Sequence, residues 1–246
     1  MLILSIETSG RNGGVALARG DAESFDLLGE APIGAGQYSA ELMPRIVELL
    51  RAAGIAKVEL EAFAVAWGPG SFTGLRVGIA TAKALAATLA KPLAAVSVLE
   101  AIVASAFRKL AACDPQARER ELQRQNMAAL MDAGRGEVYA GFYWVASARR
   151  REAEREVLLP FEGVIQELSS LAPPVTVVTP DSSVAERLRE RNISVMLVER
   201  PAARDVARLG LQKLAAGEAA GVAELDANYI RRSDAEIFSL PRLQAK

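Results

Sequence analysis

The sequence predicts a two-lobed α/β protein with a mixed sheet and helices in each lobe. Short apolar runs of strand length alternate with longer segments of helical periodicity along the 246 residues. Both halves show one order of elements: three strands in a meander, then alternating helix and strand. Hydrophobic residues make up 51% of the chain, enough for two substantial cores. We place the first lobe at residues 1–110 and the second at 111–246.

The first half is expected to contain five strands and three helices. Periodicity and turn residues place the strands at 2–6, 14–18, 24–29, 63–67 and 92–98. The helices are expected at 39–53, from a cap at Ser71 or Thr73 to Leu89, and at 99–110. Ser39 is the expected cap of the first helix.

The second half repeats this order after a charged joining segment at 114–126, which is expected to be a linker or an exposed helix. Its strands are expected at 128–131, 138–145, 156–159, 175–179 and 195–198. Its helices are expected at 161–168, 181–191 and 203–216. The helix near 203–217 is expected to pack back on the first lobe.

The stretch from Phe63 to Leu89 is the most informative part of the chain. Gly68-Pro69-Gly70-Ser71 favours a type II turn before the helix. Small residues recur at every fourth position of that helix, and each glycine there costs roughly 1 kcal/mol relative to alanine. They are Gly74, Gly78, Ala82 and Ala86. The stripe indicates close approach of another backbone, either the protein's own sheet or a partner chain.

Composition excludes several kinds of chemistry. The chain has no histidine, which removes Ser-His and Cys-His nucleophile pairs. Its one cysteine, Cys113, excludes an internal disulfide. The net charge of −1 does not favour autonomous nucleic-acid binding. No long uncharged apolar run is present, so we expect a cytoplasmic protein without a membrane span.

Two hairpin turns offer candidate cleft residues. Glu7, Thr8 and Ser9 in the first half correspond in position to Asp132 in the second. Backbone amides and a carboxylate there suit nucleotide phosphates or magnesium, although ordinary polar turns explain each residue taken alone somewhat better. Glu7, Asp132 and Glu137 are candidate general bases. The Gly68 loop lacks the spacing of a Walker A or dinucleotide-binding loop.

Three segments strongly resemble the TsaB family, also called YeaZ. They are Ile3–Ser9, Gly68–Gly78 and Met131–Tyr139, with further similarity at Tyr38–Pro44 and Asn228–Arg231. The resemblance spans nearly the whole chain. Glu7 stands where aspartate is common in the family, and Tyr38 where histidine is common.

The resemblance implies a fold and a role. TsaB-like proteins have the duplicated actin-like, ribonuclease H-like fold. The family pairs with the transferase TsaD and, with a TsaE-like ATPase, supports threonylcarbamoyladenosine synthesis beside the anticodon of tRNAs that read codons starting with A. The resemblance also implies that the chain is a non-catalytic subunit and forms a homodimer when alone. It further implies weak ATP or ADP binding in the complex with TsaD, and contact with tRNA only through that complex. Val98 and Ile102 replace the metal-binding histidines of TsaD-like chains, so no metal site is implied.

Our hypothesis places the partner surface on the first lobe, on the helix at 39–53 and the start of the helix behind the Gly68 loop. The candidate partner-binding residues are Ser39, Leu42, Ile46, Gly70, Ser71, Phe72, Thr73, Gly74, Arg76, Gly78 and Ala82. Two other hypotheses stay open: an ATP-dependent kinase or acyl-phosphate enzyme of the same fold, and a metallopeptidase.

Overall fold

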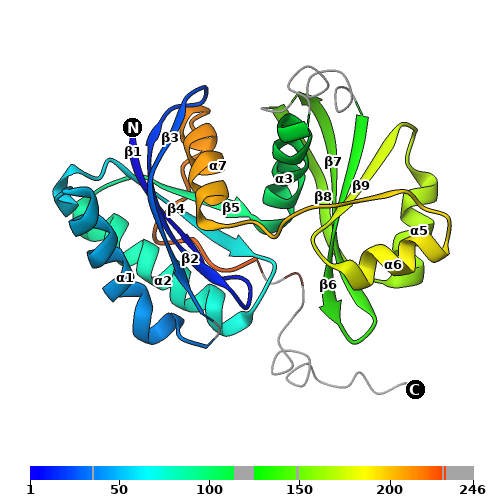
Figure 1. Ribbon diagram of the computed structural model, residues 1–246, viewed down its shortest axis with the longest axis horizontal. Coiled ribbons are helices and arrows are strands. Elements are labelled where there is room, and N and C mark those ends of the chain that lie inside the picture. The colour runs from blue at the N-terminus through cyan, green and yellow to red at the C-terminus, as the bar shows by residue number, and fades with distance from the viewer. Residues whose placement is uncertain (35, 114–124, 148–149, 229, 231–246) are drawn as a thin grey trace, which may run out of the picture.

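The chain forms two five-stranded mixed sheets, one in each half (Figure 1). This computed structural model describes residues 1–34, 36–113, 125–147, 150–228 and 230. The predicted joining segment therefore lies largely outside the described residues. None of the described helices is long and apolar enough to cross a membrane.

The first sheet has the strand order β3-β2-β1-β4-β5. Its strands are β1 (Leu2–Glu7), β2 (Gly13–Gly20), β3 (Phe25–Ile33), β4 (Ala62–Gly68) and β5 (Leu93–Ser97). β1, β2 and β3 form the antiparallel meander, whereas β1, β4 and β5 are parallel. All six residues of β1 are buried, because helices cover both faces of the sheet.

The second sheet repeats this topology, with the order β10-β9-β6-β7-β8. Its strands are β6 (Gln125–Gly134), β7 (Glu137–Ser147), β8 (Arg150–Pro160), β9 (Val175–Thr179) and β10 (Val195–Leu197). β6, β7 and β8 are the meander, and β9 and β10 add in parallel. The repeated order confirms the predicted duplicated, actin-like fold.

Helices form an outer layer on each sheet and a shared layer between the sheets (Figure 1). They are α1 (Tyr38–Ala53), α2 (Phe72–Leu89), α3 (Val98–Cys113), α5 (Phe161–Ser170), α6 (Ser182–Glu190) and α7 (Ala203–Ala215). α1 and α2 cover the first sheet from outside, and α5 and α6 cover the second. α3 and α7 lie in the middle, where their apolar faces meet residues of both sheets in one core.

The two halves exchange helices across this middle layer. α7 follows the second sheet in the chain, yet it packs on β1, β2, β4 and β5 of the first. α3 follows the first sheet and packs on β6, β7 and β9 of the second as well as on β4 and β5. Each sheet is therefore closed on its inner face by a helix from the other half.

The alternation in β4 explains why α7 can approach so closely. Phe63 and Val65 face the outer core with α1 and α2, whereas the alanines between them face α7. A Cβ atom on Gly210 of α7 would lie 2.5 Å from the Cβ of Ala64. The small residues of β4 and α7 thus set the short helix-to-sheet distance.

Two local predictions were wrong. The peptide bond between Gly68 and Pro69 is cis, and Gly68 rather than Gly70 has a positive φ, of 127°, so the loop is not a type II turn. α1 starts at Tyr38 after Gln37, with no side-chain cap, so Ser39 does not cap it. Ser39 already lies inside the first turn.

Candidate functional site

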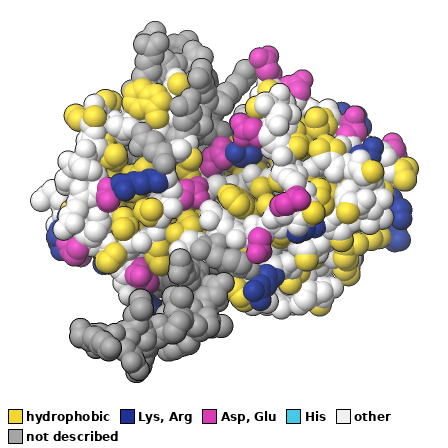
Figure 2. Space-filling model, turned by 180° about the vertical axis from the view of Figure 1, so that it is seen from behind, with side chains coloured by type: hydrophobic (Ala, Val, Ile, Leu, Met, Phe, Trp, Pro, Cys, Tyr) yellow, Lys and Arg dark blue, Asp and Glu magenta, His cyan; other side chains and the backbone are white. Residues whose placement is uncertain are grey.

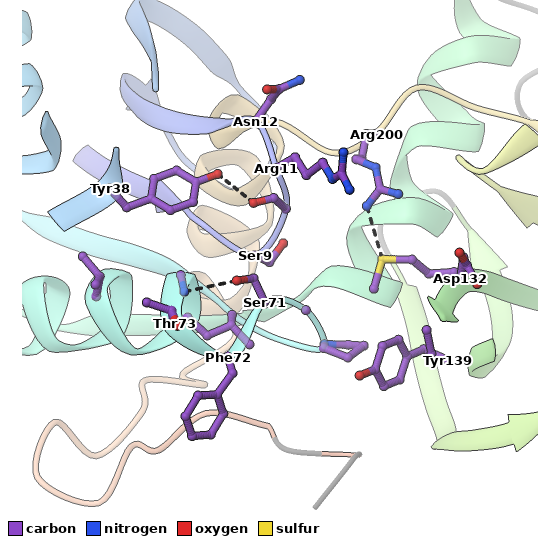
Figure 3. A pocket seen from close by; sticks show the side chains of 18 of the residues that line it. Ser9, Arg11, Asn12, Tyr38, Ser71, Phe72, Thr73, Asp132, Tyr139 and Arg200 are labelled. Carbon is purple, nitrogen blue, oxygen red and sulfur yellow. Dashed lines mark hydrogen bonds between the residues drawn. The ribbon is translucent and has the colours of Figure 1, made fainter. Parts of the chain in front are cut away.

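A cavity of about 970 Å³ opens between the two lobes (Figure 3). Its first-lobe wall is the turn after β1 and the loop that starts α2, and its second-lobe wall includes the end of β6, Tyr139 and Arg200. The cavity lies at the carboxyl ends of β1, β4 and β6, the usual place for ligands in α/β folds.

The two first-lobe segments of this wall are bonded to each other. The Ser71 amide donates a hydrogen bond to the Ser9 carbonyl oxygen, 2.7 Å away. A Cβ atom on Gly70 would lie 2.4 Å from that same oxygen, so only glycine fits there. The Ser71 hydroxyl accepts a hydrogen bond from the Gly74 amide at 3.3 Å, which confirms the predicted helix cap.

Glu7 lies beneath the cavity rather than in its wall. Its side chain is buried, and its Oε1 accepts hydrogen bonds from the Ser9 amide at 2.8 Å and from the Ser9 hydroxyl. Burial raises the pKa of Glu7, and the Ser9 bonds and the charge of Arg200 only partly offset this. The Glu7 carboxylate thus stabilises the turn after β1 and does not face the cavity.

Some of the other predicted cleft residues line the cavity, and some do not. Thr8 is fully buried against α2, and its hydroxyl has no hydrogen-bond partner among the described residues. Asp132 is exposed in the cavity wall, where its Oδ1 accepts from the Gly134 amide at 3.0 Å. Ser9 also lines the cavity, and Glu137 is half-buried at the start of β7. The structure therefore places Ser9 and Asp132 on the cavity but not Glu7 or Thr8.

The described part of the chain contains no group of three or more Asp, Glu, Cys or His residues placed to hold a metal ion.

Arginines that the sequence did not mark also reach the cavity. Arg200, just after β10, pairs with Asp181 and approaches the Met131 sulfur at 3.7 Å. Arg11 lies across from it in the β1–β2 turn (Figure 3). No motif surrounds either residue, so only the folded arrangement brings them together.

The stripe of small residues on α2 packs inside the first lobe. A Cβ atom on Gly74 would lie 2.1 Å from the Thr8 carbonyl oxygen, and one on Gly78 would lie 2.2 Å from the Thr8 hydroxyl. Ala82 is fully buried in the outer core. The backbone that approaches the stripe is thus the end of β1. The prediction that these three residues seat a partner chain is wrong, because they face their own sheet.

The remaining partner-binding candidates are divided between the core and the surface. Leu42 and Ile46 face the outer core and are each 2% exposed. Gly70 is half-buried in the cavity wall. The exposed candidates are Ser39, Ser71, Phe72, Thr73 and Arg76.

Exposed apolar side chains lie on the outer face of α1. Met43 is 46% exposed and Val47 is 49% exposed, one helical turn apart. They border a groove of about 310 Å³ between α1 and α2, lined by Leu50, Leu85 and Leu89 as well. Met43 and Val47 are not among the predicted partner residues, although their four-residue spacing on the polar side of α1 can be seen in the sequence.

A separate exposed contact stands at the start of α2, beside the cavity between the lobes. Phe72 is 39% exposed, and the guanidinium carbon of Arg76 lies 3.7 Å from the centre of its ring. Phe72 is also one of the residues that line the cavity between the lobes.

Comparison with known proteins agrees with the topology. The family model described as TsaD, tRNA N6-adenosine threonylcarbamoyltransferase, matches residues 32–237. Two solved structures superpose closely. YeaZ from Pseudomonas aeruginosa has a TM-score of 0.70 and 25% identity, and the match covers 92% of this chain and all of that one. An uncharacterized protein similar to the peptidase YeaZ from Pseudomonas aeruginosa has a TM-score of 0.71 and 26% identity, and the match covers 94% of this chain and 99% of that one.

Sequence relatives give the family. The tRNA threonylcarbamoyladenosine biosynthesis protein TsaB of Bacillus subtilis is 30% identical over 245 residues, which cover 96% of each chain. The protein of the same name from Escherichia coli is 29% identical over 208 residues, 80% of this chain and 82% of that one. The chain belongs to the TsaB (YeaZ) family, within the broader group that the TsaD model describes.

Proposed function

We propose that this chain acts in the synthesis of threonylcarbamoyladenosine in tRNA, as a non-catalytic subunit that pairs with a TsaD-like transferase. The named relatives support the pathway. The apolar groove between α1 and α2 and the exposed Met43 and Val47 of α1 support the pairing, because partners bury such surfaces. That exposed apolar face is the observation that carries the proposal.

The same face serves, in our proposal, for a homodimer when the chain is alone and for the heterodimer when the transferase is present. A stable pair buries about 800 Å² on each partner, which the outer faces of two helices can supply. A TsaE-like ATPase then joins the pair, and tRNA is bound through the complex in the cytoplasm. On the face shown in Figure 2, basic and acidic side chains are interspersed, and no broad area has one sign of charge.

A kinase or acyl-phosphate enzyme has less support. It needs carboxylates free to hold a magnesium nucleotide in the cleft. Glu7 is instead buried and bonded to Ser9, and Asp132 accepts a hydrogen bond from its own turn. Micromolar ATP affinity with phosphoryl transfer by the isolated chain would favour this second function, whereas the proposed subunit has no such activity.

Substitutions that introduce negative charge at the edge of the groove test the proposed pairing. We expect the double variant Met43→Glu/Val47→Glu to remain folded but to lose co-purification with the TsaD-like subunit, because burying two unpaired carboxylates costs several kcal/mol. Modification of tRNA in a reconstituted reaction should fall with the loss of pairing. Leu197→Glu is the matched control, since Leu197 is 36% exposed on the second lobe. Unchanged pairing of the groove variant would contradict the proposal.

A further inference from the structure

The segment that follows α7, residues 218–228, runs back along the first lobe (Figure 1). It begins at the edge of the first sheet, where the Ala220 amide donates to the Leu93 carbonyl oxygen at 2.8 Å. It then crosses α2, where the Lys83 ammonium donates to the carbonyl oxygens of Ala223 and Leu225 at 2.9 and 2.7 Å. The segment is thus fastened to β5 and α2.

The far end of this segment reaches the loop that starts α2. Leu225 and Ala227 are buried in the outer core of the first lobe. The Asn228 amide donates to the Trp67 carbonyl oxygen at 2.8 Å. A Cβ atom on Gly68 would lie 2.9 Å from the Asn228 carbonyl oxygen, so segment and loop are in direct contact.

One carboxylate of the second lobe meets this end. Glu156 of β8 accepts a hydrogen bond from the Asn228 side-chain amide on Oε2, at 3.0 Å. Its Oε1 accepts from the Tyr143 hydroxyl at 2.6 Å and from the Ser97 hydroxyl. Ser97 ends β5 and also accepts from the Leu99 amide, at 3.2 Å, in the first turn of α3. Glu156 therefore joins its own sheet, the β5–α3 junction and the segment after α7.

We infer that Glu156 is a clasp that fixes the relative position of the two lobes and holds the segment 218–228 against the α2 loop. Its three donors come from separate parts of the chain, so any opening between the lobes must break hydrogen bonds to a charged acceptor. Tyr143 is fixed in the shared core, which leaves the carboxylate little freedom to follow a displaced Asn228. The inference depends on contacts within the chain and not on the proposed pairing.

Hydrogen exchange followed by mass spectrometry tests the clasp. Glu156→Ala should raise exchange about tenfold in two places, the segment 218–228 and the first turn of α3, because a charge-assisted hydrogen bond is lost at each. Asn228→Asp places a second carboxylate against Glu156 and should raise exchange in the segment alone. Glu162→Ala is the matched control, since Glu162 makes an exposed ion pair with Arg191 within the second lobe.

A double variant that swaps the amide and the carboxylate is the decisive test. In Glu156→Gln/Asn228→Asp the amide and the carboxylate change places, so Gln donates to Asp across the same gap. Exchange in the segment should return to the level of the unaltered protein. Absence of this rescue, or a Glu156→Ala variant whose faster exchange is confined to β7 and β8, would overturn the inference. Asn228→Asp and Glu156→Gln/Asn228→Asp keep a side chain at position 156 that can accept from Tyr143 and Ser97, so both remain informative even if Glu156→Ala does not fold.

Discussion

The ionised form of the Glu7 side chain destabilises the folded protein. The carboxylate is buried beneath the cleft, and desolvation raises its pKa above the ordinary value of 4.5 despite the hydrogen bonds from Ser9. The folded state therefore binds this proton more tightly than the unfolded state does. The resulting stabilisation is fully present below pH 4.5 and is lost as pH rises through the pKa of the folded protein.

We predict that Glu7→Gln raises the melting temperature at pH 7.5 and that the gain shrinks toward pH 4. Glutamine keeps an oxygen that accepts from Ser9 but has no charge to bury. Asp21→Asn is the control of opposite sign. Hydrogen bonds from Ser24 and Glu23 lower the pKa of Asp21, so its stabilisation is present above pH 3.8 and lost as pH falls. Calorimetry from pH 2 to 8 covers both ranges, and a gain for Glu7→Gln that did not vary with pH would contradict the argument.

At the scale of elements, α2 packs on the end of β1 without room for a methyl group. The prediction is that Gly78→Ala destabilises the protein by about 1–3 kcal/mol, because overpacking outweighs the higher helix propensity of alanine. Thr8→Ala removes the hydroxyl that lies 2.2 Å from the new Cβ, so the double variant should recover part of the loss. Chemical denaturation of the four proteins of this cycle measures the coupling.

Ala80→Leu is a useful comparison, since Ala80 is exposed on the same helix. It should change the free energy of unfolding by no more than about 0.5 kcal/mol. If Gly78→Ala instead left stability unchanged but abolished pairing, the small residues would have to face a partner after all.

Most elements could be predicted from the sequence, because periodicity is a local property. The alternation from Phe63 to Trp67 predicts β4, and Ser71 predicts the cap of α2. Which surface the glycines of α2 meet could not be predicted, since a stripe of small residues fits a sheet or a partner equally well. The cis bond before Pro69 also leaves no local signal that distinguishes it from a turn.

The candidate site was less predictable than the elements. Ser9 and Asp132 could be predicted because each lies near the carboxyl end of a mostly buried strand, at the first hairpin of its half: Ser9 just after β1, and Asp132 near the end of β6. Arg11 and Arg200 come together only through folding, 189 positions apart in the sequence. The apolar face of α1 was missed because Met43 and Val47 interrupt an otherwise polar side of the helix, and single exposed apolar residues are common.

At the scale of the whole molecule, the lobes share one core. α3 and α7 contribute side chains to a cluster that includes residues of both sheets, so neither lobe can lose its fold without exposing the apolar surface of the other. We predict a single cooperative unfolding transition. The two tryptophans of the chain report on it separately, Trp67 in the first sheet and Trp144 in the second.

Urea unfolding of the single variants Trp67→Phe and Trp144→Phe tests this prediction. In each variant, the midpoint and the slope measured by the fluorescence of the remaining tryptophan should equal those measured by circular dichroism. A plateau between two transitions, or a fluorescence midpoint displaced from that of circular dichroism, would show that the lobes unfold independently.

The late position of α7 in the chain also bears on how the protein is made. A ribosome delivers roughly 5–20 residues each second, so the first sheet exists for roughly 5–20 s before the helix that closes its inner face has been synthesised. During that interval the nascent first lobe has an uncovered surface. Ala62, Ala64 and Ala94 are on that surface beside the larger Ile3 and Val96, so much of its apolar area comes from short side chains. The alanines that later admit α7 thus also limit the apolar area that the unfinished chain exposes.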